Sequence, residues 1–264
     1  MTQQRLRDAA ARLAAAGIEE AMREARILLA AAPNRFEDAI ARRAKREPVA
    51  YILGRREFWS LEFEVSPAVL IPRPDSETLV ETALKEFGAG APARILDLGT
   101  GSGCLIVSLL TEWPNATALA IDASPDALEL AARNAARHGV AGRIEFRLND
   151  WAAGLNERFD LVISNPPYIS DTALAALEPD VRDHEPAAAL KAGPEGLAAI
   201  ERIASQLPTV LKPTGLTLIE IGFDQGPAAT RILTKNGLER LRIVKDLGGR
   251  DRVMVARLPQ RTGA

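Results

Sequence analysis

The chain contains 264 residues, 47% of them hydrophobic and 26% charged, which is typical of a folded protein with one large core or two domains. Its net charge of −2 supplies no basic surplus for gripping long nucleic acid through phosphates, so we expect no direct nucleic-acid binding. The single cysteine, Cys104, excludes an internal disulfide and a cysteine-cluster zinc site, and there are only two histidines. We therefore expect no bound metal.

The hydropathy pattern gives no sign of a membrane protein. No apolar run approaches the ~20 residues that a spanning helix needs. Residues 1–5 are polar and lack the apolar core of a signal peptide. We expect a cytoplasmic protein that makes no membrane contact.

The beginning of the chain is rich in alanine and has helical periodicity. Gly17 is a typical helix stop, a second helix is predicted to end near Pro33, and a third covers residues 36–46. We expect residues 1–47 to form a small helical domain. Its basic end, residues 42–46, is interpreted as a solvated helix face, with a docking surface for a partner as the alternative.

Residues 48–74 have the pattern of an apolar connector between two domains. Partial alternation of apolar residues from 58 to 65 predicts a β-hairpin. The prolines on either side of Arg73 end the extended part, and Asp75 or Ser76 is predicted to cap the next helix. Arg73 is interpreted either as an exposed surface charge or as a residue at the mouth of an active site.

Strands alternate with helices through the remaining residues, 75–264. The predicted strands cover residues 94–98, 118–122, 144–148, 159–164, 216–221, 238–245 and 252–257. Such alternation indicates a parallel sheet, and the last two strands lack a helix between them, so one strand is antiparallel. The predicted fold class is α/β: a seven-stranded, mostly parallel, Rossmann-like sheet with helices on both faces, preceded by the helical domain and the hairpin.

A glycine-rich loop follows the first strand of this sheet. Gly99, Gly101 and Gly103 alternate with Thr100 and Ser102, and glycines let a backbone pass close to a ligand. The spacing differs from the Gly-x-Gly-x-x-Gly fingerprint of dinucleotide sites. The loop is also preceded by an aspartate, Asp97, which would repel a pyrophosphate and attract the amino or sulfonium end of S-adenosylmethionine.

Acidic side chains end the next two strands. Asp122 has the position of a carboxylate that binds ribose hydroxyls, or it caps the turn before the helix that Ser124 and Pro125 begin. Asp150 is predicted to accept from an adenine amino group, and Trp151 to pack on the ring. The alternative is a turn with a core tryptophan.

Asn165, Pro166, Pro167 and Tyr168 follow the fourth strand directly. Parallel sheets bind ligands at the carboxyl ends of their strands, and prolines stiffen the backbone after the asparagine. The Asn165 side-chain oxygen and a nearby carbonyl can hold both hydrogens of a planar NH2 group, and Tyr168 can cover it. This arrangement favours methyl transfer to an amide or amino nitrogen, although a proline-rich turn is the alternative.

These motifs resemble those of class I S-adenosylmethionine-dependent methyltransferases, and more closely the HemK/PrmC type, the peptide chain release factor glutamine-N5 methyltransferases. The resemblance covers residues 47–54, 70–77, 97–103, 150–151, 165–168, 220–226 and 245–252. Phe223 stands where tyrosine is more frequent in that family.

The resemblance implies that Gly99–Gly103, Asp122 and Trp151 hold S-adenosylmethionine and that Asn165–Tyr168 hold the glutamine of a Gly-Gly-Gln motif. The protein substrates are then class 1 peptide chain release factors, docked with help from the helical domain. We predict catalytic roles for Asn165, Pro166 and Tyr168, with Pro167 and Arg73 also contacting substrate. Asn165 is also predicted to contact the cofactor, and we expect a monomer.

Two other functions remain open from the residues. The first is a nucleic-acid amino-methyltransferase acting on adenine N6 or guanine N2, because the same corner can hold an exocyclic amine. The second is a nucleotide-binding module without catalysis. The near-neutral charge and the lack of a target-reading domain argue against the first.

Overall fold

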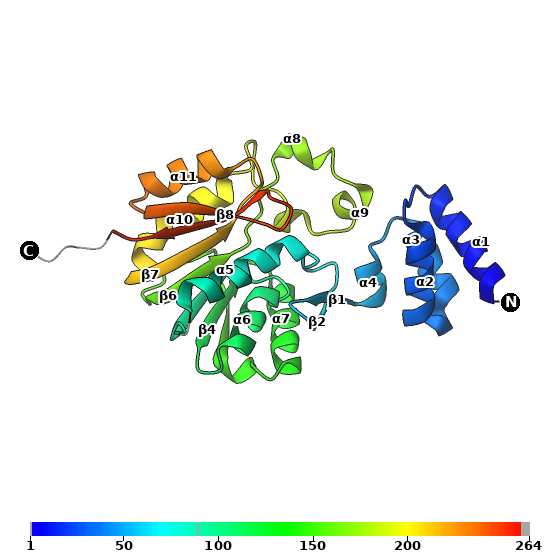
Figure 1. The fold of residues 1–264 in the computed structure, drawn as a ribbon, viewed down its shortest axis with the longest axis horizontal. Helices are drawn as coiled ribbons and strands as arrows, with labels where there is room; N and C mark the ends of the chain where they lie inside the picture. The colour runs from blue at the N-terminus through cyan, green and yellow to red at the C-terminus, as the bar shows by residue number, and fades with distance from the viewer. Residues whose placement is uncertain (1, 89, 260–264) are drawn as a thin grey trace, which may run out of the picture.

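The computed structural model describes residues 2–88 and 90–259. Three helices open the chain: α1 (Thr2–Ala15), α2 (Ala21–Ala31) and α3 (Phe36–Arg43), with a 3-10 turn η1 (Pro33–Arg35) before the third. They pack around their own apolar core, in which Leu13, Leu28 and Ile40 are fully buried. In Figure 1 these helices lie at one end of the molecule, apart from the sheet. The third helix ends three residues before its predicted limit, and Arg46 adopts a positive φ of 68°.

The connector contains a short helix, α4 (Val49–Leu53), and then a two-stranded antiparallel hairpin, β1 (Arg55–Phe58) and β2 (Leu61–Glu64). The two turn residues, 59 and 60, both have positive φ, as the tightest hairpin turns require. Phe58 and Phe63 are buried on the same face and meet edge to face at 6.3 Å between ring centroids. The predicted hairpin is thus confirmed, whereas the predicted domain boundaries at residues 47 and 74 stay predictions.

Seven strands form the main sheet. They are β3 (Arg94–Leu98), β4 (Thr117–Asp122), β5 (Ile144–Leu148), β6 (Phe159–Ser164), β7 (Leu211–Glu220), β8 (Glu239–Lys245) and β9 (Asp251–Arg257). Their spatial order is β5-β4-β3-β6-β7-β9-β8, and β9 runs antiparallel to both of its neighbours. This confirms the predicted fold class, including the single antiparallel strand.

Helices cover both faces of the sheet because neighbouring strand residues point in opposite directions. Ile95 packs into the cluster beneath α5 (Glu77–Phe87), α6 (Cys104–Glu112) and α7 (Pro125–Arg137), whereas Leu96 packs into the cluster beneath α10 (Ala198–Val210) and α11 (Gly226–Lys235). Ser124 caps α7 as predicted, since its hydroxyl accepts from the Ala127 N–H at 3.2 Å. No helix within the described part of the chain has the length and apolar character needed to cross a bilayer.

The segment between β6 and α10 runs out from the sheet toward the N-terminal helices and back, as Figure 1 shows. It holds two single-turn helices, α8 (Asp171–Leu174) and α9 (Pro179–Arg182), and a 3-10 turn, η4 (Ala187–Ala189). Its buried Glu185 accepts from the Ile71 N–H at 3.2 Å and pairs with Arg73 at 2.5 Å. The segment is therefore fastened to the connector.

Candidate active site

A cavity of about 450 Å³ opens at the carboxyl ends of β3, β4, β5 and β6, within the range of roughly 300–1,000 Å³ that is common for small-molecule sites. The chain runs outward from β3 through β4 to β5 and then crosses back to β6, which lies on the other side of β3. The cavity lies at this topological switch point, where such sheets bind ligands. Its walls include residues 68–70, 72–73, 76, 99–102, 104–105, 121–124, 127, 149–151, 165, 167, 186 and 188–189. Loops from both halves of the chain thus form one pocket.

The three loop glycines have positive φ angles of 75°, 54° and 79°. A Cβ on Gly99 would lie 3.3 Å from the Trp151 ring, and one on Gly103 would lie 3.2 Å from Ala131 of α7. A Cβ on Gly101 would meet nothing within 4 Å. Gly99 and Gly103 therefore permit close packing behind the loop, while Gly101 leaves open space on the cavity side.

Asp97 lies fully buried beneath this loop. Its Oδ2 accepts from the Thr100 hydroxyl at 2.7 Å, whereas no described residue supplies a donor to Oδ1. Burial raises the pKa of Asp97 to about 7, against the opposing effect of the Thr100 hydrogen bond. A buried carboxylate oxygen without a partner fits a cationic ligand group, such as an ammonium or a sulfonium.

Asp122 lines the cavity and joins two of its loops. Its Oδ2 accepts from the Gly101 N–H and its Oδ1 from the Ser124 N–H, both at 2.9 Å. Asp122 thus stabilises the turn before α7, but the cap of that helix is Ser124, so the alternative interpretation of Asp122 as the capping residue was wrong. Each carboxylate oxygen has a second lone pair, so the predicted ribose contact stays a prediction.

Asp150 and Trp151 also line the cavity, from the loop after β5. The Asp150 carboxylate is half-exposed and pairs with Arg202 of α10, a partner that sequence reasoning did not foresee. Trp151 has a positive φ of 51° and packs behind Gly99. Their predicted contacts with adenine stay predictions.

Asn165 projects into the cavity directly after β6. Its Nδ2 donates to the Ser76 hydroxyl at 3.0 Å, and no donor within residues 2–88 or 90–259 reaches its Oδ1. Pro167 lines the cavity as well. The structure therefore brings the predicted amide acceptor to the same pocket as the glycine loop.

Pro166 and Tyr168 do not line the cavity, unlike their neighbours Asn165 and Pro167. Pro166 is buried, and the Tyr168 hydroxyl lies 3.4 Å from Oε1 of Glu220 at the end of β7. Burial, with the Glu220 charge adding to it, raises the pKa of Tyr168 well above its usual value, so the phenol stays neutral. Their predicted roles in catalysis stay predictions.

Glu220 was missed as a candidate residue. It is 1% exposed, its Oε2 has no partner among the described residues, and burial raises its pKa to about 7. A carboxylate at the end of the apolar run 216–221 was the available signal. Arg73, by contrast, was predicted near the mouth of the site and does line the cavity, where it pairs with Glu185.

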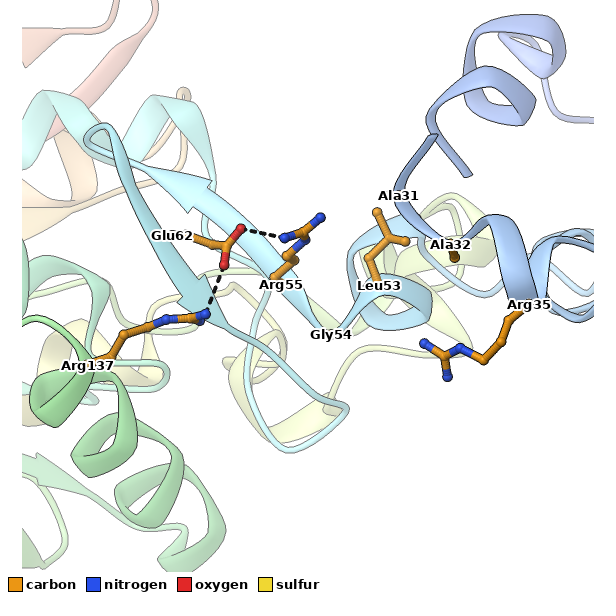
Figure 2. A pocket seen from close by; sticks show the side chains of 8 residues that line it. All are labelled: Ala31, Ala32, Arg35, Leu53, Gly54, Arg55, Glu62 and Arg137. Carbon is orange, nitrogen blue, oxygen red and sulfur yellow. Dashed lines mark hydrogen bonds and ion pairs between the residues drawn. The ribbon is translucent and has the colours of Figure 1, made fainter. Parts of the chain in front are cut away.

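A second hollow, of about 310 Å³, lies between the end of α2 and the hairpin. In Figure 2, Glu62 accepts from Arg55 and pairs with Arg137, at 2.9 and 3.0 Å. None of the predicted site residues lies there. Within the described residues, no cluster of three or more His, Cys, Asp or Glu side chains is arranged to hold a metal ion.

Comparison with known families adds to this geometry. Residues 74–179 match the Methyltransferase small domain, and residues 31–54 match the PrmC N-terminal domain. The fold is similar to that of a methyltransferase from Pyrococcus furiosus, with a TM-score of 0.56 and 17% identity over 83% of this chain and 98% of the other. It is also similar to the hMettl16 catalytic domain, with a TM-score of 0.64 and 17% identity over 86% and 84% of the two chains.

The Rossmann-like sheet, the glycine-lined cavity at its switch point, the match to the Methyltransferase small domain and the names of its relatives together identify this protein as a methyltransferase. The release factor glutamine methyltransferase of Cereibacter sphaeroides is 48% identical over 96% of this chain and 97% of its own. That of Agrobacterium fabrum is 42% identical over 93% of both chains. The chain belongs to the family of release factor glutamine methyltransferases.

Proposed function

We propose that this enzyme transfers a methyl group from S-adenosylmethionine to the side-chain amide nitrogen of the glutamine in the Gly-Gly-Gln motif of class 1 peptide chain release factors. The names of its relatives support this substrate. The observation that carries the proposal is the free Oδ1 of Asn165 in the same cavity as the glycine loop. An acceptor there fits an amide NH2 group.

The residues present fit the cofactor. Gly101 leaves space for a ligand against the loop, and Asp97 offers an unpartnered buried oxygen to a cationic group. Asp122 and Trp151 both line the cavity, which supports the proposal that Asp122 takes the ribose hydroxyls and Trp151 packs along the base. When bound, S-adenosylmethionine supplies an electrophilic methyl group on a positively charged sulfur.

The protein then has to position a weak nucleophile, the glutamine amide nitrogen, against the methyl group. An amide nitrogen has a delocalised lone pair, and Asn165 is neutral, so catalysis relies on positioning rather than on proton abstraction. Asn165 Oδ1 in the cavity wall is proposed to hold one amide hydrogen and to stabilise the positive charge that grows on nitrogen. The predicted acceptor for the second hydrogen is the carbonyl of the adjacent Pro166, which is buried outside the cavity lining. Orientation of this kind can contribute roughly 7–11 kcal/mol to lowering a barrier. The surplus proton passes to solvent.

Residues 1–47 are proposed as the docking domain, 48–74 as the connector and 75–264 as the catalytic domain. Arg73 at the cavity wall is proposed to contact the peptide that flanks the glutamine. We propose that the enzyme acts in the cytoplasm as a monomer that binds release factor without contacting nucleic acid.

The proposal is tested by incubating the full chain with purified release factor and methyl-labelled S-adenosylmethionine. Mass mapping should place one methyl group on the Gly-Gly-Gln glutamine. A release factor with glutamine replaced by alanine should stay unlabelled. Labelling of RNA or DNA oligonucleotides in parallel reactions, with none on release factor, would overturn the assignment.

A further inference from the structure

Ser76 makes the one described contact that fixes the Asn165 side chain from outside its own loop. Ser76 ends the 3-10 turn η2 (Pro74–Ser76) before α5, is 2% exposed, and lines the cavity. Its hydroxyl oxygen accepts from Asn165 Nδ2 at 3.0 Å. Two segments far apart in the sequence therefore meet at the group that is proposed to bind substrate.

The direction of this hydrogen bond fixes which end of the Asn165 amide faces Ser76. Asn165 Nδ2 donates and the serine oxygen accepts. Glu220 lies close by, and the Ser76 hydroxyl opposes the burial that raises the pKa of this carboxyl. The Asn165 amide is thus held with its nitrogen toward Ser76.

The orientation decides what the cavity offers to an amide substrate. With Nδ2 held by Ser76, the free end of Asn165 is the acceptor Oδ1. A flipped side chain would present Nδ2 instead, and two NH2 groups would then face each other, donor against donor. A substrate NH2 group that met Nδ2 would lose its buried acceptor, so the orientation in the structure is the one that suits an amide substrate.

We propose that Ser76 is a positioning residue for methyl transfer, which holds the Asn165 amide with its oxygen toward the substrate. Glu220 lies 3.4 Å from the Tyr168 hydroxyl, at the other end of the Asn-Pro-Pro-Tyr corner. The inference rests on the proposed function, since it assumes an amide substrate. It adds Ser76 to the predicted set, and Ser76 does not have to touch the methyl donor.

The test compares Ser76→Ala with Ser76→Thr, using the full chain and a Gly-Gly-Gln release factor. Ser76→Ala should lower kcat by about 10- to 100-fold, because a misaimed reacting group costs that much. If the proposal holds, the Kd of Ser76→Ala for S-adenosylhomocysteine, measured by titration calorimetry, should differ from that of the wild type by no more than about 2-fold. Ser76→Thr keeps the hydroxyl and should restore most of the lost kcat. Ser108→Ala is the matched control, because Ser108 is also fully buried but its hydroxyl has no partner in the described structure.

A double-mutant cycle separates positioning from a general structural role. If Ser76 acts through Asn165, then Ser76→Ala should cost nothing further in an Asn165→Ala background. A full additional loss there, or equal losses of kcat and cofactor affinity in Ser76→Ala alone, would overturn the inference. Loss of labelling in Asn165→Ala with wild-type turnover in Ser76→Ala would reject the inference alone, whereas wild-type turnover in Asn165→Ala would reject the proposed function.

Discussion

Arg43 of α3 lies 2.7 Å from Asp180 of α9, and its guanidinium is almost fully buried, with 5% of the side chain exposed. Glu24 of α2 pairs with the same guanidinium at 2.5 Å, and Arg46 pairs with Asp180 at 2.5 Å. These ion pairs join the N-terminal helices to the segment that carries η4, whose residues line the cavity. The helical region is thus bound to a wall of the active site.

Asp180→Asn should therefore destabilise the protein. Removing one partner leaves the buried Arg43 with Glu24 as its remaining described ion-pair partner, and we expect a loss of about 1–3 kcal/mol in the free energy of unfolding by urea. Asp183→Asn is the matched control. Asp183 is half-exposed and pairs with its neighbour Arg182 at 2.8 Å, so its replacement should leave the stability nearly unchanged. Equal effects in the two variants would contradict the assigned role of Asp180.

Gly99→Ala should weaken cofactor binding. The new Cβ would lie 3.3 Å from the Trp151 ring and push a wall of the cavity, so we expect Kd for S-adenosylmethionine to rise by about 10-fold, or about 1.4 kcal/mol. Gly139→Ala has the same backbone strain, because φ is 72° at Gly139 and 75° at Gly99, but its Cβ would meet nothing within 4 Å. Both variants should lose about 1–2 kcal/mol of stability. Only the first should change Kd in calorimetry, and a similar change in both would contradict the packing argument.

The affinity for S-adenosylmethionine should depend on pH through Asp97. Burial raises the pKa of this group to about 7, so below pH 7 the carboxyl is mostly neutral in the free enzyme. A cationic ligand prefers the ionised form, and affinity should therefore rise by up to about 10-fold per pH unit as pH approaches 7, and then level off. Calorimetry across this range checks the slope.

The Asp97→Asn variant should bind S-adenosylmethionine more weakly, and its affinity should no longer change with pH. Burial also raises the pKa of Glu220 to about 7, so the Glu220→Gln variant is the control that shows which of the two carboxyl groups causes the pH dependence. Glu220→Gln should keep the pH dependence if Asp97 is its source. A slope that survives in Asp97→Asn and vanishes in Glu220→Gln would move the assignment to Glu220.

Local sequence patterns were enough to predict the seven strands of the sheet and the edge at which the cavity lies, although β7 begins at Leu211 rather than at residue 216. Ile95 and Leu96 are consecutive apolar residues of one strand that are buried on opposite faces of the sheet, which is the pattern expected when helices cover both faces. Asn165 directly follows a predicted strand, which places it at the carboxyl end of the sheet. Such local patterns do not predict which residues far apart in the sequence contact each other. Asp75 or Ser76 was predicted as the cap of α5. Ser76 does stand at the cap position, but its hydroxyl makes no capping bond and instead accepts from Asn165, 89 residues away in the sequence. Arg43 was read as part of a solvated face or docking surface, and the interpretation as a solvated face was wrong for this residue, because Asp180 buries it.

Asn165→Ala should lower turnover far more than cofactor affinity. The substitution removes the Oδ1 acceptor that faces the cavity but leaves the glycine loop, Asp97 and Asp122 in place. Loss of one preorganised group that stabilises growing charge costs about 100-fold or more in kcat. We expect that loss with release factor as substrate, while Kd for S-adenosylhomocysteine stays within about 2-fold if the cofactor does not rely on Asn165. Asn236→Ala, at the end of α11, removes a half-buried amide outside the cavity and should leave kcat unchanged. Equal losses of turnover and cofactor affinity in Asn165→Ala would mean that Asn165 holds the cofactor rather than aiming the glutamine.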